Sequence, residues 1–257
     1  MVVWTSAWLH GAAASDDVVD ALQTWAEDHE VRAASDELAT RLELPGPQGR
    51  PAGAGLLLAA LRKAGAARGD LVLPVAGDVR GLDGASPFSQ FALRCGEAGV
   101  FADAGLGVVP EHVAEGVLRW SVFELGVLPP AEYVPIGEAE HGMASAMREA
   151  ASTLNDLDIA RHRPGVRGEI AEAVSARPQP DWPDDAPQRP LRVLQRAAEV
   201  EAILRVASDD APGGALSSSA TRARTDALRP LFDAVRSARC AAVAEMVRVL
   251  ADRTEQY

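Results

Sequence analysis

A proline-rich stretch at residues 177–190 limits the possible folds of this chain more than any other feature, because five of its fourteen residues are proline. The proline ring fixes φ and leaves no amide hydrogen, so such a stretch forms neither a helix interior nor a central strand. It predicts an extended linker. If the linker is exposed, limited proteolysis should cut there first, whereas cuts only elsewhere would mean that it is held against the folded body.

Before this linker, helical and strand patterns alternate as far as Pro135. Apolar residues at helical spacing and suitable N-capping residues predict helices, which begin at Ser15 and Ser86 or cover 36–43 and 54–65. Short apolar runs predict strands. These strands are expected at 70–75, 99–102, 106–109 and 117–125. Residues 1–135 are therefore predicted to form a mixed α/β module, with a small β-sheet and flanking helices.

From residue 136 onward the pattern is helical. Apolar residues recur at intervals of three and four, which places them on one face of each helix. Helices are expected at 137–160, 166–176, 190–208 and 218–255, the last with a kink or break at Pro230. The sequence therefore predicts a helix-rich α+β fold, with a small mixed β-sheet in the first half and a helical bundle in the C-terminal half, residues 136–257.

Charge and cysteine usage exclude several classes of protein. The net charge of −12 argues against nucleic-acid binding, since phosphate recognition needs a basic surface. The sequence has no run of 18 apolar residues, so we predict no membrane-spanning helix. Cys95 and Cys240 lie far apart in the sequence and neither belongs to a CxxC pair, which favours a reducing cytoplasm without a disulfide between them.

The loop at residues 77–84 is the strongest candidate for a ligand contact. It follows a predicted strand and combines Asp78, Arg80 and Asp83 with three glycines that would let a ligand approach the backbone. The same residues are typical of a turn whose glycines supply positive φ and whose charges face water. If the loop is a binding site, the three charged side chains should converge on a cavity, because each is costly to desolvate alone.

Three further residues are candidates for ligand contact beside this loop: Trp120, Glu138 and His141. Glu138 and His141 stand at i and i+3 on the helix predicted at 137–160, a spacing that helical di-iron sites use twice. The chain has no second Glu-x-x-His, and acidic residues are expected at a helix start because of the helix dipole. We therefore predict no metal site, no cofactor and no catalytic residue.

Three runs of sequence carry a resemblance to a known family: LVLPVAGDVRGL at 71–82, RCGEA at 94–98 and RVLQRAAEVE at 192–201. They resemble the sequences of a family of uncharacterised actinobacterial proteins, and the similarity covers most of the chain. This resemblance implies the cytoplasm of a bacterium with a GC-rich genome. It transfers no activity, cofactor or catalytic residue.

The leading functional hypothesis is a non-enzymatic, cytoplasmic interaction or regulatory protein, whose partner is another protein or a second copy of the chain. The alternative is a small-molecule-binding protein or enzyme that uses the 77–84 loop. A third hypothesis is a nucleic-acid-associated factor that uses the arginines of the C-terminal helices, and salt-dependent binding would be its signature.

Overall fold

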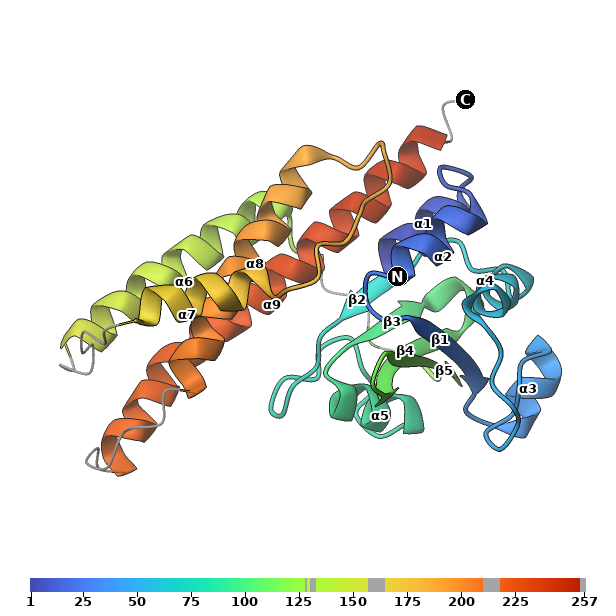
Figure 1. The fold of residues 1–257 in the computed structure, drawn as a ribbon, viewed down its shortest axis with the longest axis horizontal. Helices are drawn as coiled ribbons and strands as arrows, with labels where there is room; N and C mark the ends of the chain where they lie inside the picture. Colours follow the sequence, from blue (N-terminus) through green and yellow to red (C-terminus); the bar gives the residue numbers. More distant parts are fainter. Residues whose placement is uncertain (128, 130–132, 157–164, 210–217, 255–257) are drawn as a thin grey trace. The chain divides into compact units, whose positions relative to one another are not determined.

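The structure is a computed structural model that describes residues 1–127, 129, 133–156, 165–209 and 218–254, and it divides into two compact units (Figure 1). The sheet unit comprises Met1–Tyr133, Pro178–Pro187 and Val243–Tyr257. The helical unit comprises Val134–Arg177 and Gln188–Ala242. The predicted fold class is confirmed, since the first half holds a mixed sheet with flanking helices and the C-terminal half is helical.

The sheet has five strands in the order β1-β5-β4-β3-β2. The strands are β1 (Asp28–Ala33), β2 (Asp70–Val72), β3 (Ala98–Phe101), β4 (Leu106–Ala114) and β5 (Val117–Glu124). Strands β2 to β5 pair antiparallel, and β1 pairs parallel with β5, with Glu30 opposite Arg119. Because these two residues carry opposite charges, Arg119 Nη2 lies 2.7 Å from Glu30 Oε2 and strengthens the pairing of β1 with β5.

Short helices flank this sheet (Figure 1). They are α1 (Val2–Leu9), α2 (Ser15–Leu22), α3 (Asp36–Leu42), α4 (Ala54–Lys63), α5 (Pro87–Cys95) and the 3₁₀ turn η1 (Ala102–Ala104). Serine caps start two of them, because Ser35 Oγ accepts from Leu38 N and Ser86 Oγ accepts from Ser89 N. Pro87 then occupies the first turn of α5, where a missing amide hydrogen is tolerated.

Apolar clusters cover both faces of the sheet, because successive residues of a strand point to opposite faces. In β4, Leu106 and Val108 belong to a cluster that helices α3 and α4 complete. The next residue, Val109, belongs to a second cluster with Phe88 of α5 and Phe123 of β5. Gly107, which lies between Leu106 and Val108 in the sequence, leaves room for the Phe88 ring. A Cβ at this glycine would lie 2.3 Å from Phe88 Cε2. Helix α5 can therefore lie close against β4.

Within its described residues, the helical unit contains four helices (Figure 1). They are α6 (Ile136–Asp156), α7 (Val166–Ser175), α8 (Gln188–Asp209) and the part of α9 (Ser218–Thr254) that precedes Val243. Its core joins α6, α8 and α9 through Met143, Val200 and Val235 together with many alanines. Arg177, just after α7, adds a polar link, since its Nη2 lies 3.0 Å from Glu201 Oε2 of α8. The same carboxylate oxygen lies 3.5 Å from Arg239 Nη1 of α9.

Two sequence predictions about prolines are corrected. Residues 177–187 contain no helix, but the expectation that the non-helical stretch continues to Pro190 is wrong, because α8 begins at Gln188. Pro190 stands in the first turn of α8, where its ring has no preceding turn to clash with. Of the two alternatives expected at Pro230, a kink or a break, the break is wrong, since α9 is helical on both sides of that residue.

Element bounds differ from prediction at several other points. Strand β2 ends at Val72, before Pro74, whereas β4 continues past Val109 to Ala114. Helix α6 is described as far as Asp156, and the predicted helical residues 157–160 lie outside the described part of the chain. Helix α1 and strand β1 were not predicted. Helix α1 is largely buried and shows no polar face, and β1 is a polar edge strand with only Val31 and Ala33 buried.

Candidate functional site

The 77–84 loop begins with a tight turn that β2 leads into. Val75 and Asp78 exchange two backbone hydrogen bonds of 2.9 Å, and Gly77 between them has a φ of +88°. Glycine adopts this left-handed region without the steric cost that a Cβ would bring. Gly77 was one of the glycines expected to let a ligand approach the backbone. In the structure it supplies the positive φ that this turn requires.

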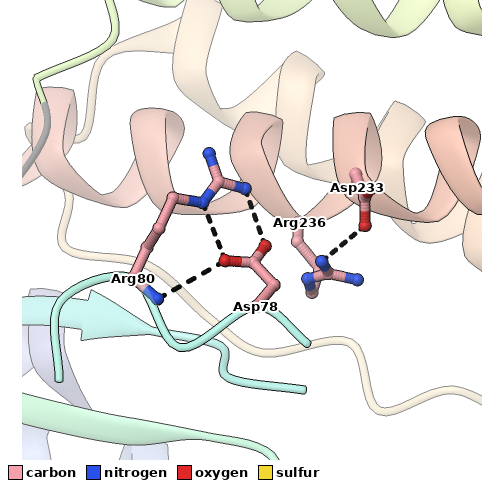
Figure 2. A network of polar contacts seen from close by, with 4 residues as sticks. All are labelled: Asp78, Arg80, Asp233 and Arg236. Carbon is pink, nitrogen blue, oxygen red and sulfur yellow. Dashed lines mark hydrogen bonds and ion pairs between the residues drawn. The ribbon is translucent and has the colours of Figure 1, made fainter. Parts of the chain in front are cut away.

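Asp78 and Arg80 bind each other within the loop (Figure 2). Arg80 Nε donates to Asp78 Oδ1 at 2.9 Å, and Arg80 Nη2 donates to Asp78 Oδ2 at 2.8 Å. This two-point geometry satisfies the fork of the guanidinium with both carboxylate oxygens. A second pair in Figure 2, Arg236 with Asp233, joins neighbouring turns of α9 at 2.6 Å.

Asp83 is used at the start of α5. Its Oδ1 accepts hydrogen bonds from Ser89 Oγ at 2.5 Å, Ser86 Oγ at 2.8 Å and Ser86 N at 3.1 Å. The Ser89 hydroxyl, followed by the Ser86 donors, lowers the pKa of the Asp83 carboxyl below its usual value. Asp83 therefore binds the first turn of α5 through these hydrogen bonds.

Trp120 lies on the other face of the sheet from the loop's buried residue. Its side chain packs in the cluster of α3 and α4, whereas Leu82 packs in the cluster of α5. Trp120 Nε1 donates to His29 Nδ1 at 3.0 Å, so His29 carries its hydrogen on Nε2 and donates it to the Leu22 carbonyl at 2.9 Å. Burial lowers the pKa of His29, which keeps this neutral tautomer in place.

Glu138 and His141 lie in the other unit. Both are exposed on the first turns of α6, where the neighbouring Glu140 pairs with Arg189 of α8 at 3.0 Å. Within the described residues, no three His, Cys, Asp or Glu side chains gather closely enough to hold a metal ion. The six predicted ligand contacts are thus distributed over an ion pair, a helix cap, the core of the sheet and a helix of the second unit.

The structure adds one contact that sequence reasoning missed. We call residues Pro178–Pro187 the strap; both chain neighbours, Arg177 and Gln188, belong to the helical unit, but the strap belongs to the sheet unit. Trp4 Nε1 of α1 donates to the Asp181 carbonyl of the strap at 2.9 Å. Pro183 and Ala186 of the strap are buried. The only available signal was the combination of an extended proline-rich segment with a tryptophan-bearing apolar start of the chain.

The cysteines and the helices limit other kinds of chemistry. Cys95 and Cys240 are both thiols, and they belong to different units. Burial raises the pKa of the Cys95 thiol above its usual value, with Glu111 acting in the same direction, which disfavours a reactive thiolate. Across the part of the chain that is described, no helix has both the length and the apolar character to cross a bilayer.

Comparison with known proteins gives a consistent result over nearly the whole chain. Residues 1–133 match the family described as "Rv1486c-like protein, N-terminal domain", and residues 137–240 match "Rv1486c-like protein, C-terminal domain". The chain is 38% identical over 273 residues to "Uncharacterized protein Rv1486c" of Mycobacterium tuberculosis, covering 94% of this chain and 93% of the relative. It is 34% identical to "Uncharacterized protein ML1804" of Mycobacterium leprae, with 94% of each chain covered.

No solved structure matches the chain. The predicted resemblance to an uncharacterised actinobacterial family is confirmed by these mycobacterial relatives, and none of their printed names carries an activity. The chain therefore belongs to the Rv1486c-like protein family.

Proposed function

We propose that this protein is a non-enzymatic interaction protein of the cytoplasm, and that its sheet unit binds an extended segment of another protein. The observation that carries the proposal is the strap. A non-helical stretch of chain belongs to the sheet unit, and its Asp181 carbonyl accepts a hydrogen bond from the Trp4 indole. Every residue has a backbone carbonyl, so the same donor can hold a segment from a different chain.

The charged loop gives less support to the alternative of an enzyme or a small-molecule-binding protein. Asp78 and Arg80 neutralise each other, and Asp83 is committed to the cap of α5. A ligand that used these groups would have to replace contacts that the folded protein already makes, and this replacement costs free energy. The cytoplasmic location is supported by Cys95 and Cys240, which are not joined in a disulfide.

The test uses the full chain with the strap replaced by a glycine-serine segment of equal length, so that the Trp4 surface is open. We expect this bait to recover a protein partner from a bacterial cytoplasm, and we expect Trp4→Phe in the same bait to abolish that recovery. Binding of the purified partner to the purified bait completes the test. The matched control is Trp25→Phe, because Trp25 is an exposed tryptophan (45%) of the same unit.

A thermal-shift panel of small molecules tests the alternative on the parent protein. A ligand present at 100 times its dissociation constant raises the free energy of unfolding by about 2.7 kcal/mol. If a compound stabilises the parent, loses its effect in the variant Asp78→Ala/Arg80→Ala, and no partner depends on Trp4, the interaction proposal is wrong.

A further inference from the structure

The strap has the composition of a segment that binds without a large ordering cost. Four of its ten residues are proline, and Pro180 and Pro183 enclose Asp181 and Trp182 in a Pro-x-x-Pro pattern. Proline rings and the residues before them favour the extended polyproline conformation even in a free chain. Less conformational entropy is therefore lost when such a segment docks.

The strap accepts a hydrogen bond of the kind that occurs in polyproline recognition. The Asp181 carbonyl, in the middle of the Pro-x-x-Pro pattern, accepts the hydrogen bond from Trp4 Nε1. Polyproline segments lack internal hydrogen bonds, so their carbonyls are available to an aromatic donor, and their rings pack on aromatic surfaces. Pro183 is buried, and beyond it the strap turns back through a hydrogen bond of 2.8 Å from Ala186 N to Pro183 O.

Helix α1 presents the aromatic side chains that such recognition needs. Trp4 and Trp8 are one helical turn apart and belong to the same apolar cluster, with Val18 and Leu58. Arg62 of α4 lies over the Trp8 ring at 3.6 Å, which fixes the orientation of that ring. Trp8 is thus covered by the Arg62 guanidinium, whereas the Trp4 indole N–H donates a hydrogen bond to the strap.

We infer that the strap is an intramolecular occupant of a Pro-x-x-Pro binding surface at Trp4, and that the partner is a protein whose extended Pro-x-x-Pro segment must displace the strap to bind. This inference rests on the proposed function and adds to it the class of partner and a form of regulation. A tethered segment has an effective concentration of about a millimolar, so it competes strongly with any free segment of similar affinity.

The experiment measures binding of a labelled synthetic peptide with the sequence of residues 177–190 by fluorescence anisotropy. The proteins are the parent chain and the full chain in which the strap is replaced by glycine and serine. We expect binding to the replaced chain and an apparent Kd at least about tenfold weaker for the parent. Trp4→Phe in the replaced chain should weaken binding by a similar factor, as should a peptide with Pro180 and Pro183 changed to glycine, whereas Trp25→Phe should not.

If the peptide binds the parent and the replaced chain with equal affinity, the strap does not compete for the surface and the proposed regulation is wrong. The assignment of a Pro-x-x-Pro binding surface would still be supported. If the replaced chain keeps a Trp4-dependent protein partner but does not bind the peptide, the Pro-x-x-Pro assignment is wrong and the proposed function survives. If the replaced chain binds neither the peptide nor a Trp4-dependent protein partner, both the Pro-x-x-Pro assignment and the proposed function are wrong.

A second measurement does not depend on replacing the strap. In the full chain, Trp4→Phe keeps the apolar ring and removes the donor to Asp181. The Ala186 amide of the strap donates to the Pro183 carbonyl. We expect this amide to exchange hydrogen at least about tenfold faster than in the parent, and Trp25→Phe to leave its exchange unchanged. Unchanged exchange in Trp4→Phe would show that the indole does not hold the strap.

Discussion

The two units solve the problem of core packing differently. In the sheet unit, large aromatic side chains make specific contacts. The Phe88 ring packs against Gly107, and the Trp120 indole donates a hydrogen bond to His29. In the described part of the helical unit, seven of the fourteen buried residues of the main apolar cluster are alanine, and half-buried ion pairs such as Arg177 with Glu201 join its segments. The sheet unit should therefore respond to changes in the shape of single residues, and the helical unit to helix propensity and charge.

The largest effect is expected where a methyl group is added to the sheet unit. Gly107→Ala places a Cβ 2.3 Å from Phe88 Cε2, and the Phe88 ring is buried and cannot move freely. Overpacking of this kind should lower the free energy of unfolding by about 3 kcal/mol, measured by urea denaturation. Combining it with Phe88→Leu should restore part of the loss. A Gly107→Ala protein as stable as the parent would show that α5 is not pressed against β4.

A smaller effect is expected at the hydrogen bond between His29 and Trp120. His29→Phe keeps a ring but removes the acceptor of the buried indole N–H, which should cost about 1–2 kcal/mol at pH 7.5. The charged groups that act on His29 are the Met1 amino group, which lowers its pKa, and Asp28, which raises it. Both remain in the variant, so a comparison of parent and variant isolates the imidazole.

His29 also predicts a pH dependence. Its pKa in the folded protein is lowered from 6.5, mainly by burial, so the unfolded chain binds the proton more readily. The stabilisation from neutral His29 is fully present above pH 6.5 and is lost as pH falls from there through the lowered folded pKa. Thermal melts at pH 7.5, 6.5 and 5.5 should show a steeper fall in Tm for the parent than for His29→Phe. Parallel curves would exclude His29 as the cause.

In the helical unit, removing a carboxylate should have a moderate effect. Glu201→Ala leaves Arg177 and Arg239 without their shared partner. Because these side chains are about one-quarter exposed, water replaces part of the lost interaction, and we expect a loss of about 1 kcal/mol. Added salt should reduce the difference between parent and variant in chemical denaturation. A difference that does not change with salt would point to packing as the cause.

A methyl group added to the helical unit should have the opposite sign to Gly107→Ala. Gly142 lies within α6, and a Cβ there would meet nothing within 4 Å. Alanine is the better helix former, so Gly142→Ala should raise the free energy of unfolding by about 0.5–1 kcal/mol. This pair of glycine variants tests the comparison directly: destabilisation by both would mean that the helical unit is as tightly fitted as the sheet unit.

The smallest effect is expected in the loop that the sequence ranked first. Asp78→Ala/Arg80→Ala removes both members of an ion pair together, so neither charge loses its partner within that pair. Arg80 is exposed and Asp78 is partly buried, and loss of such a surface ion pair usually alters the free energy of unfolding by less than about 0.5 kcal/mol. Calorimetry of the double variant checks this value. A much larger loss would show that the loop, like Gly107, is part of the close fit of the sheet unit.

The sequence predicted the two units unequally, for a physical reason. Helix formation depends on neighbours three and four residues away, so the apolar stripe of Met143, Met147 and Leu154 was sufficient to predict α6. Strand order depends on distant partners, and nothing near Asp28–Ala33 shows that this polar segment pairs with β5. The fold class could therefore be predicted, whereas the sheet topology could not.

The candidate site shows the same division. Sequence reasoning singled out the 77–84 loop and noted that its glycines and charges also suit a turn. It could not find the contact between Trp4 and Asp181, because a single side chain reaches a backbone carbonyl 177 positions away. A backbone acceptor has no side-chain signature, so only the tertiary structure brings this contact to light.

The pairing of β1 with β5 has a consequence for how the chain acquires its structure over time. Strands β3, β4 and β5 are consecutive antiparallel neighbours and can pair by closing short loops. Strand β1 must wait for a partner 89 positions further along, measured from Glu30 to Arg119. Closing so long a loop is slow, so the edge at β5 stays open in the meantime. During synthesis, β1 is made early and can join the sheet only after β5 has left the ribosome.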